Sequence, residues 1–319
     1  MTGTLEPPNG LLVIDKPEGL TSFDVVAVVR RTLKTKKAGH TGTLDPMATG
    51  VLPICLGEAT RLVPFILDGD KTYEATLRLG AATDTQDRTG RIVAEAPVPS
   101  TLTAQVVERA LDRFRGEIAQ APPMFSAVRV DGKRLYELAR EGKEIERAAR
   151  PVVIRRLELL ELSLPSLRLR VHCSKGTYVR TLAHDLGEAL GCHAHLTALR
   201  RTRSAGFGID QSVSLDLLSR MDQAALQERI LTPSQALAAL PAVVVPDGLI
   251  GRVAQGQRLA AAALGVPAGE DGERVRMVSP KGALLAVAEW RLAELSYLRV
   301  QAKPGREGSK SIPGPGRDP

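Results

Sequence analysis

Four segments of the chain carry the apolar pattern of β-strands. Two alternate apolar and polar side chains, and two are short apolar runs between turn-forming residues. They are residues 11–14, 51–56, 71–79 and 167–173. In residues 71–79 the apolar side chains from Tyr73 to Leu79 face one way and polar side chains face the other. This alternation predicts strands with one buried face.

Helix-spaced apolar positions follow the strands. A helix after Thr21 or Ser22, either of which can cap it, is predicted by valines at helical spacing. Two further helices are predicted over residues 106–114 and 177–190, the second ended by Gly191. Residues 127–133 predict a strand entering a hairpin turn, followed by a short helix. Strands followed by single helices, with hairpins between them, indicate a mixed α+β domain with a largely antiparallel sheet.

The character of the chain changes near Leu240. Short strands are predicted at residues 275–278, 284–287 and 298–300, joined by Gly- and Pro-containing turns. Residues 303–319 contain eight Gly or Pro in seventeen positions, a composition that favours disorder. We therefore expect a main domain over residues 1–240, a small β domain over 241–302 and a disordered tail over 303–319.

Composition limits the functional class. No apolar run reaches the ~20 residues that a membrane helix needs, and residues 1–10 lack the features of a secretory signal. We therefore expect a cytoplasmic protein without a membrane partner. The three cysteines do not indicate a disulfide framework. Cys192, His193 and His195 lack a second Cys/His pair at zinc-site spacing, so no metal site is expected.

Positive charge is concentrated in three stretches. The net charge is +7 and the pI is about 9.5, which suggests a polyanionic partner. Residues 30–37 hold five cations and no acid, and residues 129–156 and 168–203 also have an excess of cations. A single basic run is usually a solvated face. Three runs around one candidate site favour contacts with phosphates.

The candidate site is the glycine-punctuated loop over residues 39–50. Asp45 precedes Pro46, which holds the chain extended at Asp45. The glycines permit close approach of another molecule to the backbone. An Asp-Pro pair in a glycine-rich loop is by itself typical of a simple turn. Arg180, at the start of a predicted helix, could keep a partly buried carboxylate ionised. Tyr73 and Tyr178 offer flat faces for stacking on a nucleobase.

These motifs, taken in order, resemble the pseudouridine synthase family. The match extends over about residues 9–232, and its pieces are residues 15–17, 39–46, 48–50, 71–73, 174–180 and 195–201. Two further motifs, at residues 123–127 and 132–136, are similar to bacterial members that act on uridine 55 of tRNA. The C-terminal β domain resembles, more loosely, the PUA-type RNA-binding domain of those members.

The resemblance implies a reaction and a set of roles. A uridine of the tRNA T-loop would be isomerised to pseudouridine without a cofactor, by a monomeric enzyme that flips the base out. Asp45 corresponds to the nucleophile, Arg180 to its partner, and Tyr73 to the tyrosine that stacks on the base and is implicated in deprotonating C5. The remaining substrate-site positions are Tyr178 and Leu199 in the pocket, His40 against the RNA, and Lys16 in a motif that mainly packs beneath the loop.

Two other classes remain open from the residues alone. Basic segments and a small β domain would suffice for a non-catalytic RNA-binding or RNA-folding protein, although such a protein has no use for a carboxylate in a basic cleft. An aspartate-based hydrolase such as a phosphatase is disfavoured, because the metal-binding carboxylates it needs are missing near Asp45. The chain also has neither a GxxxxGK[ST] nor a GxGxxG motif.

Overall fold

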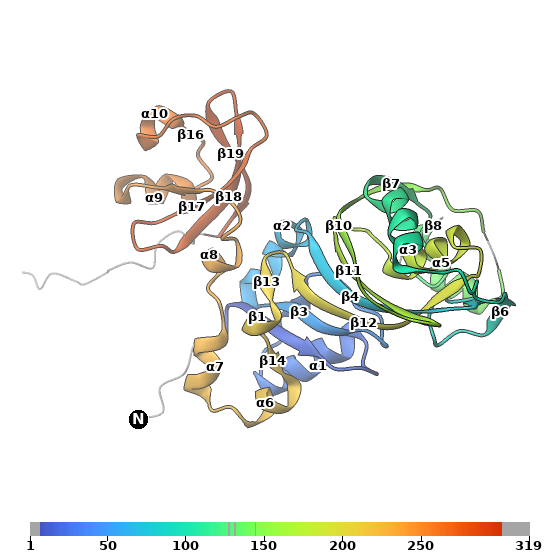
Figure 1. Cartoon of the computed structure of the whole chain (residues 1–319). Coiled ribbons are helices and arrows are strands. Elements are labelled where there is room, and N and C mark those ends of the chain that lie inside the picture. Colours follow the sequence, from blue (N-terminus) through green and yellow to red (C-terminus); the bar gives the residue numbers. More distant parts are fainter. Residues whose placement is uncertain (1–6, 127, 131, 144, 302–319) are drawn as a thin grey trace, which may run out of the picture. The chain divides into compact units, whose positions relative to one another are not determined.

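The computed structural model describes residues 7–126, 128–130, 132–143 and 145–301. The chain divides into two compact units, Met1–Ile230 and Leu231–Pro319, and each is described by itself (Figure 1).

The first unit is built on a ten-stranded sheet. Its strand order is β14-β1-β3-β12-β4-β11-β10-β7, with β13 paired to β12 and β2 paired to β3. The pairs β1–β14 and β3–β12 are parallel, and the other neighbours are antiparallel. The strands are β1 (Gly10–Lys16), β2 (Ala38–His40), β3 (Thr49–Leu56), β4 (Lys71–Leu79), β7 (Gly116–Gln120), β10 (Arg150–Ser163), β11 (Ser166–Cys173), β12 (Ala194–Ser204), β13 (Phe207–Gly208) and β14 (Val213–Ser214). The expected mixed, largely antiparallel sheet is confirmed.

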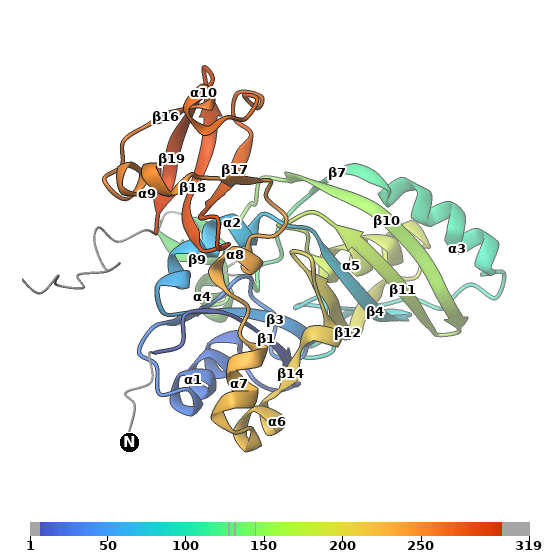
Figure 2. The same ribbon diagram turned by 90° about the vertical axis from the view of Figure 1, so that its left-hand side faces the viewer.

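Several helices of this unit pack against the sheet. Its helices are α1 (Ser22–Thr32), α2 (Val63–Leu67), α3 (Ala104–Leu111), α4 (Leu135–Arg140), α5 (Val179–Ala189), α6 (Leu215–Arg220) and α7 (Gln223–Arg229). Helix α5 packs on β12 and α3 packs on β10, while α1 and α6 lie side by side near the β14 edge (Figure 2). Two small hairpins complete the unit: β5 (Ala81–Thr83) with β6 (Ile92–Glu95), and β8 (Arg129–Val130) with β9 (Lys133–Arg134).

The apolar pattern accounts for which side chains form the core. In β4 the four side chains from Tyr73 to Leu79 are buried, as the alternation predicts, and pack with buried residues of β11 and α5. Helix α1 begins where expected. Thr21 is its N-cap and forms a capping box with Asp24, which satisfies backbone N–H groups at the helix start. The predicted hairpin is present as β8–β9, although positions 127 and 131 lie outside the described residues.

The second unit is a small β domain with short helices. Its sheet has the order β15-β17-β18-β19-β16, and its core contains Met277, Trp290 and Leu295. The elements are α8 (Pro233–Ala236), β15 (Ala242–Val244), α9 (Asp247–Ala254), β16 (Leu259–Ala260), α10 (Ala261–Leu264), β17 (Arg274–Val278), β18 (Leu284–Arg291) and β19 (Glu294–Val300).

The two compact units divide between Ile230 and Leu231. Within the second unit, the guanidinium of Arg276 on β17 donates to the Ser234 hydroxyl at 2.9 Å and to the Leu240 carbonyl at 3.0 Å. These bonds tie residues 234–240 to the second unit.

The tail expected over residues 303–319 lies outside the described residues. Among the residues that the structure describes, no helix is long and apolar enough to span a membrane.

Candidate active site

Hydrogen bonds from side chains of distant segments hold the loop over residues 41–48, between β2 and β3, in place. The Ser22 hydroxyl accepts from the Leu44 N–H at 2.9 Å and donates to the Leu44 carbonyl at 3.1 Å. The Lys16 ammonium, which has no exposed surface, donates to the Pro46 carbonyl at 3.2 Å. Residues on both sides of Asp45 are therefore held by side chains outside the loop.

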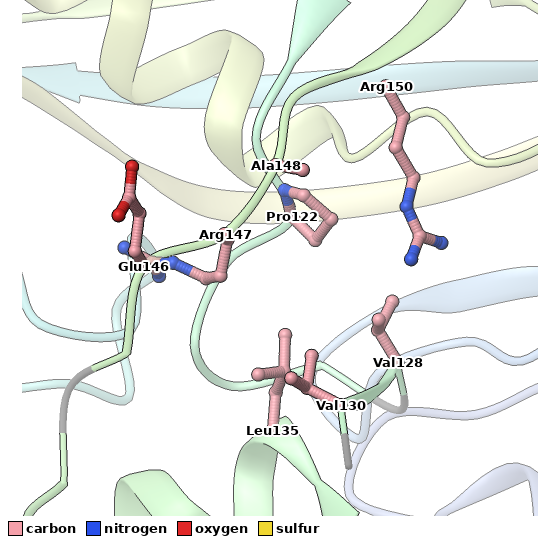
Figure 3. A pocket seen from close by; sticks show the side chains of 8 residues that line it. All are labelled: Pro122, Val128, Val130, Leu135, Glu146, Arg147, Ala148 and Arg150. Atoms are coloured by element: carbon pink, nitrogen blue, oxygen red, sulfur yellow. The ribbon is translucent and has the colours of Figure 1, made fainter.

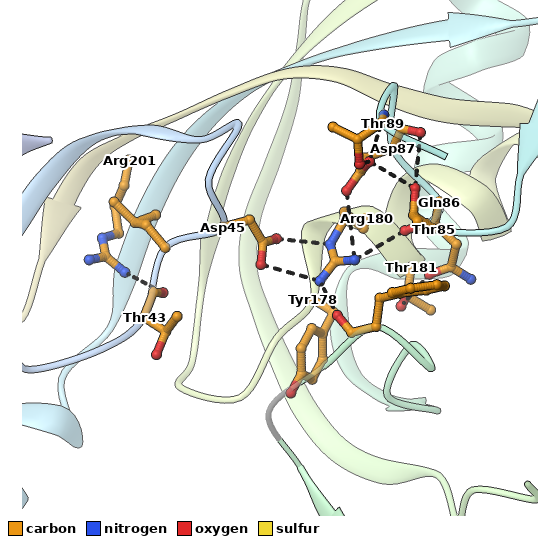
Figure 4. A network of polar contacts seen from close by, with 12 residues as sticks. Thr43, Asp45, Thr85, Gln86, Asp87, Thr89, Tyr178, Arg180, Thr181 and Arg201 are labelled. Carbon is orange, nitrogen blue, oxygen red and sulfur yellow. Dashed lines mark hydrogen bonds and ion pairs between the residues drawn. The ribbon is translucent and has the colours of Figure 1, made fainter. Parts of the chain in front are cut away.

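Arg201 of β12 is the third fixed point of the loop. It is only 1% exposed, and its guanidinium donates to the carbonyls of Val51 at 2.7 Å, Gly42 at 3.1 Å and Thr43 at 3.4 Å (Figure 4). A Cβ at Gly50 would lie 2.2 Å from the Arg201 carbonyl oxygen, and Gly50 has a φ of +103°. Only glycine can therefore occupy the point where β3 meets β12.

Asp45 and Arg180 form a two-pronged ion pair at the centre of the site. Arg180 Nε lies 2.9 Å from Asp45 Oδ2, and Arg180 Nη2 donates to Asp45 Oδ1 at 3.3 Å. The side chain of Asp45 is 36% exposed and that of Arg180 only 5%. The guanidinium is thus part of the protein interior, while the carboxylate it orients remains open to an incoming molecule.

A second carboxylate, that of Asp87, lies close to the Arg180 guanidinium. Asp87 Oδ2 lies 3.7 Å from Arg180 Nη1. Its Oδ1 accepts from the Thr89 N–H at 2.9 Å and from the hydroxyls of Thr85 and Thr89. Arg180 also donates to the carbonyls of Thr85 and Phe125, which fixes the plane of the guanidinium (Figure 4). The segment Thr83–Gly90 is polar, and nothing in its local sequence indicates that Asp87 reaches Arg180.

The electrostatic balance at Asp45 has three main contributions. Desolvation by the surrounding protein raises the pKa of Asp45 above its ordinary value, the Arg180 charge opposes this, and Asp87 adds to it. The net effect is a raised pKa. Burial also lowers the pKa of Lys16, to about 8, although the nearby Asp45 carboxylate favours its charged form.

The two tyrosines lie on different elements. Tyr73, on β4, is buried, and this burial raises its pKa, with the nearby Arg201 opposing the shift. Tyr178 is half-buried at the N-cap of α5, and burial also raises its pKa. The Gln120 side chain of β7 accepts from the Tyr178 N–H at 2.7 Å and donates to its carbonyl at 3.1 Å. Gln120 is a second positioning residue that sequence reasoning missed.

The remaining expected site residues differ in accessibility. His40, on β2, is half-buried, and its ring stands edge-on to Phe23 with 5.2 Å between centroids. Leu199, on β12, is buried beside Ala75 of β4. Lys16 offers no surface to RNA in this structure, so its contacts are with the loop.

A hollow elsewhere in the unit contains none of the expected site residues (Figure 3). It is lined by Pro122, Val128, Val130, Leu135, Glu146, Arg147, Ala148 and Arg150.

The basic stretches are divided between several environments. Arg168 and Arg170 pair with Glu74, and Arg200 pairs with Asp15. In the first stretch Lys37 pairs with Glu58. By contrast, three exposed cations near α1 form no ion pair within the described part of the chain: Arg31, Lys34 and Lys36.

Sequence comparison finds known proteins that are similar to this chain. Residues 30–179 match the family model of the TruB family pseudouridylate synthase N-terminal domain, and residues 180–239 match that of the tRNA pseudouridylate synthase B C-terminal domain. The chain is 53% identical to tRNA pseudouridine synthase B of Aromatoleum aromaticum, over 79% of this chain and 82% of that protein. It is 46% identical to tRNA pseudouridine synthase B of Azoarcus sp., over 92% and 95%.

Solved structures show the same fold. A Cbf5-Nop10-Gar1 complex contains a chain that superposes with a TM-score of 0.74 at 29% identity, covering 93% of this chain and 86% of that one. An H/ACA RNP bound to a substrate RNA contains another, with a TM-score of 0.70 at 26% identity, covering 94% and 92%. Together with the matched family models, these likenesses confirm the resemblance seen in the sequence motifs: the chain belongs to the TruB family of pseudouridine synthases, which are RNA-modifying isomerases.

Proposed function

We propose that the protein isomerises uridine 55 in the T-loop of tRNA to pseudouridine, with Asp45 as the nucleophile and without a cofactor. The tRNA substrate is suggested by relatives named tRNA pseudouridine synthase B. Such a substrate would place the enzyme in the cytoplasm, where we expect it to act as a monomer.

The observation that carries the proposal is the Asp45–Arg180 pair. Its guanidinium is buried and held from three sides, whereas its carboxylate is partly open. A protein that only binds RNA gains nothing from an open carboxylate, which repels phosphate. A group that attacks an electron-poor atom of a bound nucleotide needs this combination of access and orientation.

The reaction moves one bond of the nucleotide. Asp45 acts on the flipped-out nucleotide, the N1–C1′ glycosidic bond breaks, and the uracil turns. A bond then forms between C5 and C1′, the proton on C5 is transferred to N1 by way of a base or solvent, and Asp45 is released unchanged. Substrate and product are isomers, so no electron or group donor is required. A base inside a folded RNA loop must first leave its stack, at a cost of a few kcal/mol.

The surrounding residues provide the binding free energy for that step. We assign Tyr73 to stacking on the target base and to contact with its C5 edge, and Tyr178 and Leu199 to the walls of the pocket. Because burial raises the pKa of Tyr73, its phenol is neutral in the free enzyme. His40 contacts the RNA, and the second unit, in this proposal a PUA-like domain, adds RNA-binding surface.

The test is incubation with an unmodified tRNA transcript, followed by mapping of pseudouridine. The protein should form pseudouridine at position 55, and Asp45→Asn should form none while binding the transcript with nearly unchanged affinity. Asp216→Asn, which changes an exposed carboxylate on α6, is the matched control and should remain active. Pseudouridine formed by Asp45→Asn would refute the nucleophile, and pseudouridine only at another position would refute the T-loop target.

A further inference from the structure

Phe23 has an unusual position for an aromatic residue of this chain. The chain has five phenylalanines, four tyrosines and one tryptophan. Among the residues that the structure describes, Phe23 is the one aromatic residue in the exposed class, at 66%. A single exposed apolar side chain is common on protein surfaces. The surroundings of Phe23 give this one a specific meaning.

Phe23 lies close to the loop over residues 41–48, which carries Asp45. It follows Ser22, whose hydroxyl makes both hydrogen bonds to Leu44, and Leu44 is the neighbour of Asp45. Phe23 is the residue after Ser22, and Asp45 is the residue after Leu44. Each is therefore about 3.8 Å along the chain from the Ser22–Leu44 contact. Phe23 is also in ring contact with His40, which β2 places immediately before this loop.

The ring has one aromatic neighbour, and its backbone is well supported. Its face-to-edge contact with His40, at 5.2 Å and 80°, favours this orientation of the ring. The capping box of Thr21 and Asp24 stabilises the first turn of α1, which carries the ring. An aromatic ring that is supported in this way and largely open to solvent is suited to stacking on an unpaired base.

Charge near the same helix favours a nucleic acid over an apolar partner. Arg31 lies roughly 12 Å further along α1, from eight residues at 1.5 Å each, and Lys34 and Lys36 follow it. These three exposed cations form no ion pair among the residues described. An aromatic face with cations beside it combines the two means by which proteins bind single-stranded nucleic acid.

We propose that Phe23, whose ring packs against His40, forms a stacking platform for a second unpaired base of the tRNA loop, next to the uridine that enters the Asp45 site. This inference rests on the proposed function. Stacking on Phe23 holds the loop open while the target base is in the pocket, so Phe23 is a positioning residue outside the reacting centre.

The first experiment measures affinity without turnover. In the Asp45→Asn background, Phe23→Ala should weaken binding of a T-arm hairpin RNA about tenfold, as expected for loss of one stacked base. Phe23→Trp should bind within about twofold of the parent because it keeps a stacking face. Phe23→Leu, which keeps bulk but has no π face, should bind as weakly as Phe23→Ala. The control Val93→Ala removes a 63% exposed apolar side chain on β6 and should leave affinity unchanged.

The second experiment identifies the base. Each unpaired base of the hairpin is replaced in turn by an abasic site, and the Phe23→Ala penalty is measured on every RNA. The penalty should disappear at one position beside the target uridine, since removing either member of a stacked pair removes the same interaction. A penalty that is the same on every RNA, or full rescue by Phe23→Leu, overturns the inference.

The two proposals fail in different ways. If the unmodified protein forms pseudouridine in tRNA but Phe23→Ala binds like its parent, the platform is refuted and the proposed function stands. If the unmodified protein neither forms pseudouridine nor binds the RNA, both are refuted.

Discussion

Two groups of arginines from the same basic stretch, residues 168–203, lie in opposite surroundings. Arg168 and Arg170 stand on the outer face of β11, half-exposed, and pair with Glu74, Glu158 and Glu161. Arg180 and Arg201 are buried. Arg180 donates to the carbonyls of Thr85 and Phe125, and Arg201 donates to those of Gly42 and Val51. Their charge alone does not distinguish these four residues in the sequence.

The difference shows what a buried guanidinium can do that an exposed one cannot. On the outer face of the sheet, water screens the charges, and such pairs contribute little to stability. Beneath the loop, several donors in one rigid plane bind backbone carbonyls and, at Arg180, both oxygens of the partly exposed Asp45 carboxylate. The buried arginines therefore determine geometry, while the exposed ones mainly neutralise their neighbours.

The largest effect is expected from Arg180→Lys. A lysine keeps the charge but cannot contact both oxygens of Asp45 while also reaching the carbonyls of Thr85 and Phe125. We expect a 10²–10³-fold loss of turnover with a small change in tRNA affinity, by analogy with the loss of one preorganised donor. Single-turnover kinetics on a tRNA transcript measure it. Arg168→Lys is the matched control, and equal losses in the two variants would show that burial is not the deciding factor.

An intermediate effect is expected from Arg201→Met. The substitution keeps an apolar stem but leaves the carbonyls of Gly42, Thr43 and Val51 without their donor. We expect the free energy of unfolding to fall by about 2 kcal/mol, together with reduced turnover because the loop loses an anchor. Chemical denaturation measures the first quantity. The same change at Arg170, on the outer face, should have no measurable effect on unfolding; a comparable loss there would contradict the comparison.

The smallest effect is a shift in pH dependence. In the proposed mechanism activity requires ionised Asp45, so it should fall as the pH drops through the pKa of Asp45. Because that pKa is raised, the acid limb lies above the ordinary aspartate range. Asp87 contributes to the raised value, so Asp87→Asn should move the limb to lower pH while its amide oxygen still accepts from Thr89. A pH–rate profile that stays in place, with the Asp216→Asn profile as reference, would count against this assignment.

The fold could be predicted wherever the strands keep a regular period. β4 alternates without interruption, and its bounds agree with the predicted residues 71–79. β10 has fourteen residues and was not predicted. Its pairing with β11 shifts register after Ile154 and again after Leu159, and each irregularity moves the following side chains to the other face. β12 is irregular at two places in the same way, so its apolar pattern also fails to indicate a strand.

The site could be predicted where its residues lie in recognisable local motifs, as Asp45 and Arg180 do. Asp87 and Gln120 lie in segments whose composition indicates only a turn or an exposed strand. They reach Arg180 and Tyr178 through contacts that the folding of distant segments creates. Neither residue has a local sequence feature that indicates such a contact.

The way the loop over residues 41–48 joins the sheet has a consequence for how its length can vary. Before the loop, His40 is paired in register with Ile54, and after it Gly50 is paired with Arg201 of β12. Between these fixed ends, Leu44 and Pro46 are each bonded to a residue outside the loop. One inserted or deleted residue would displace the Asp45 carboxylate from the Arg180 fork, whatever side chain was added. This segment should therefore tolerate changes of residue at its exposed positions far better than changes of residue number.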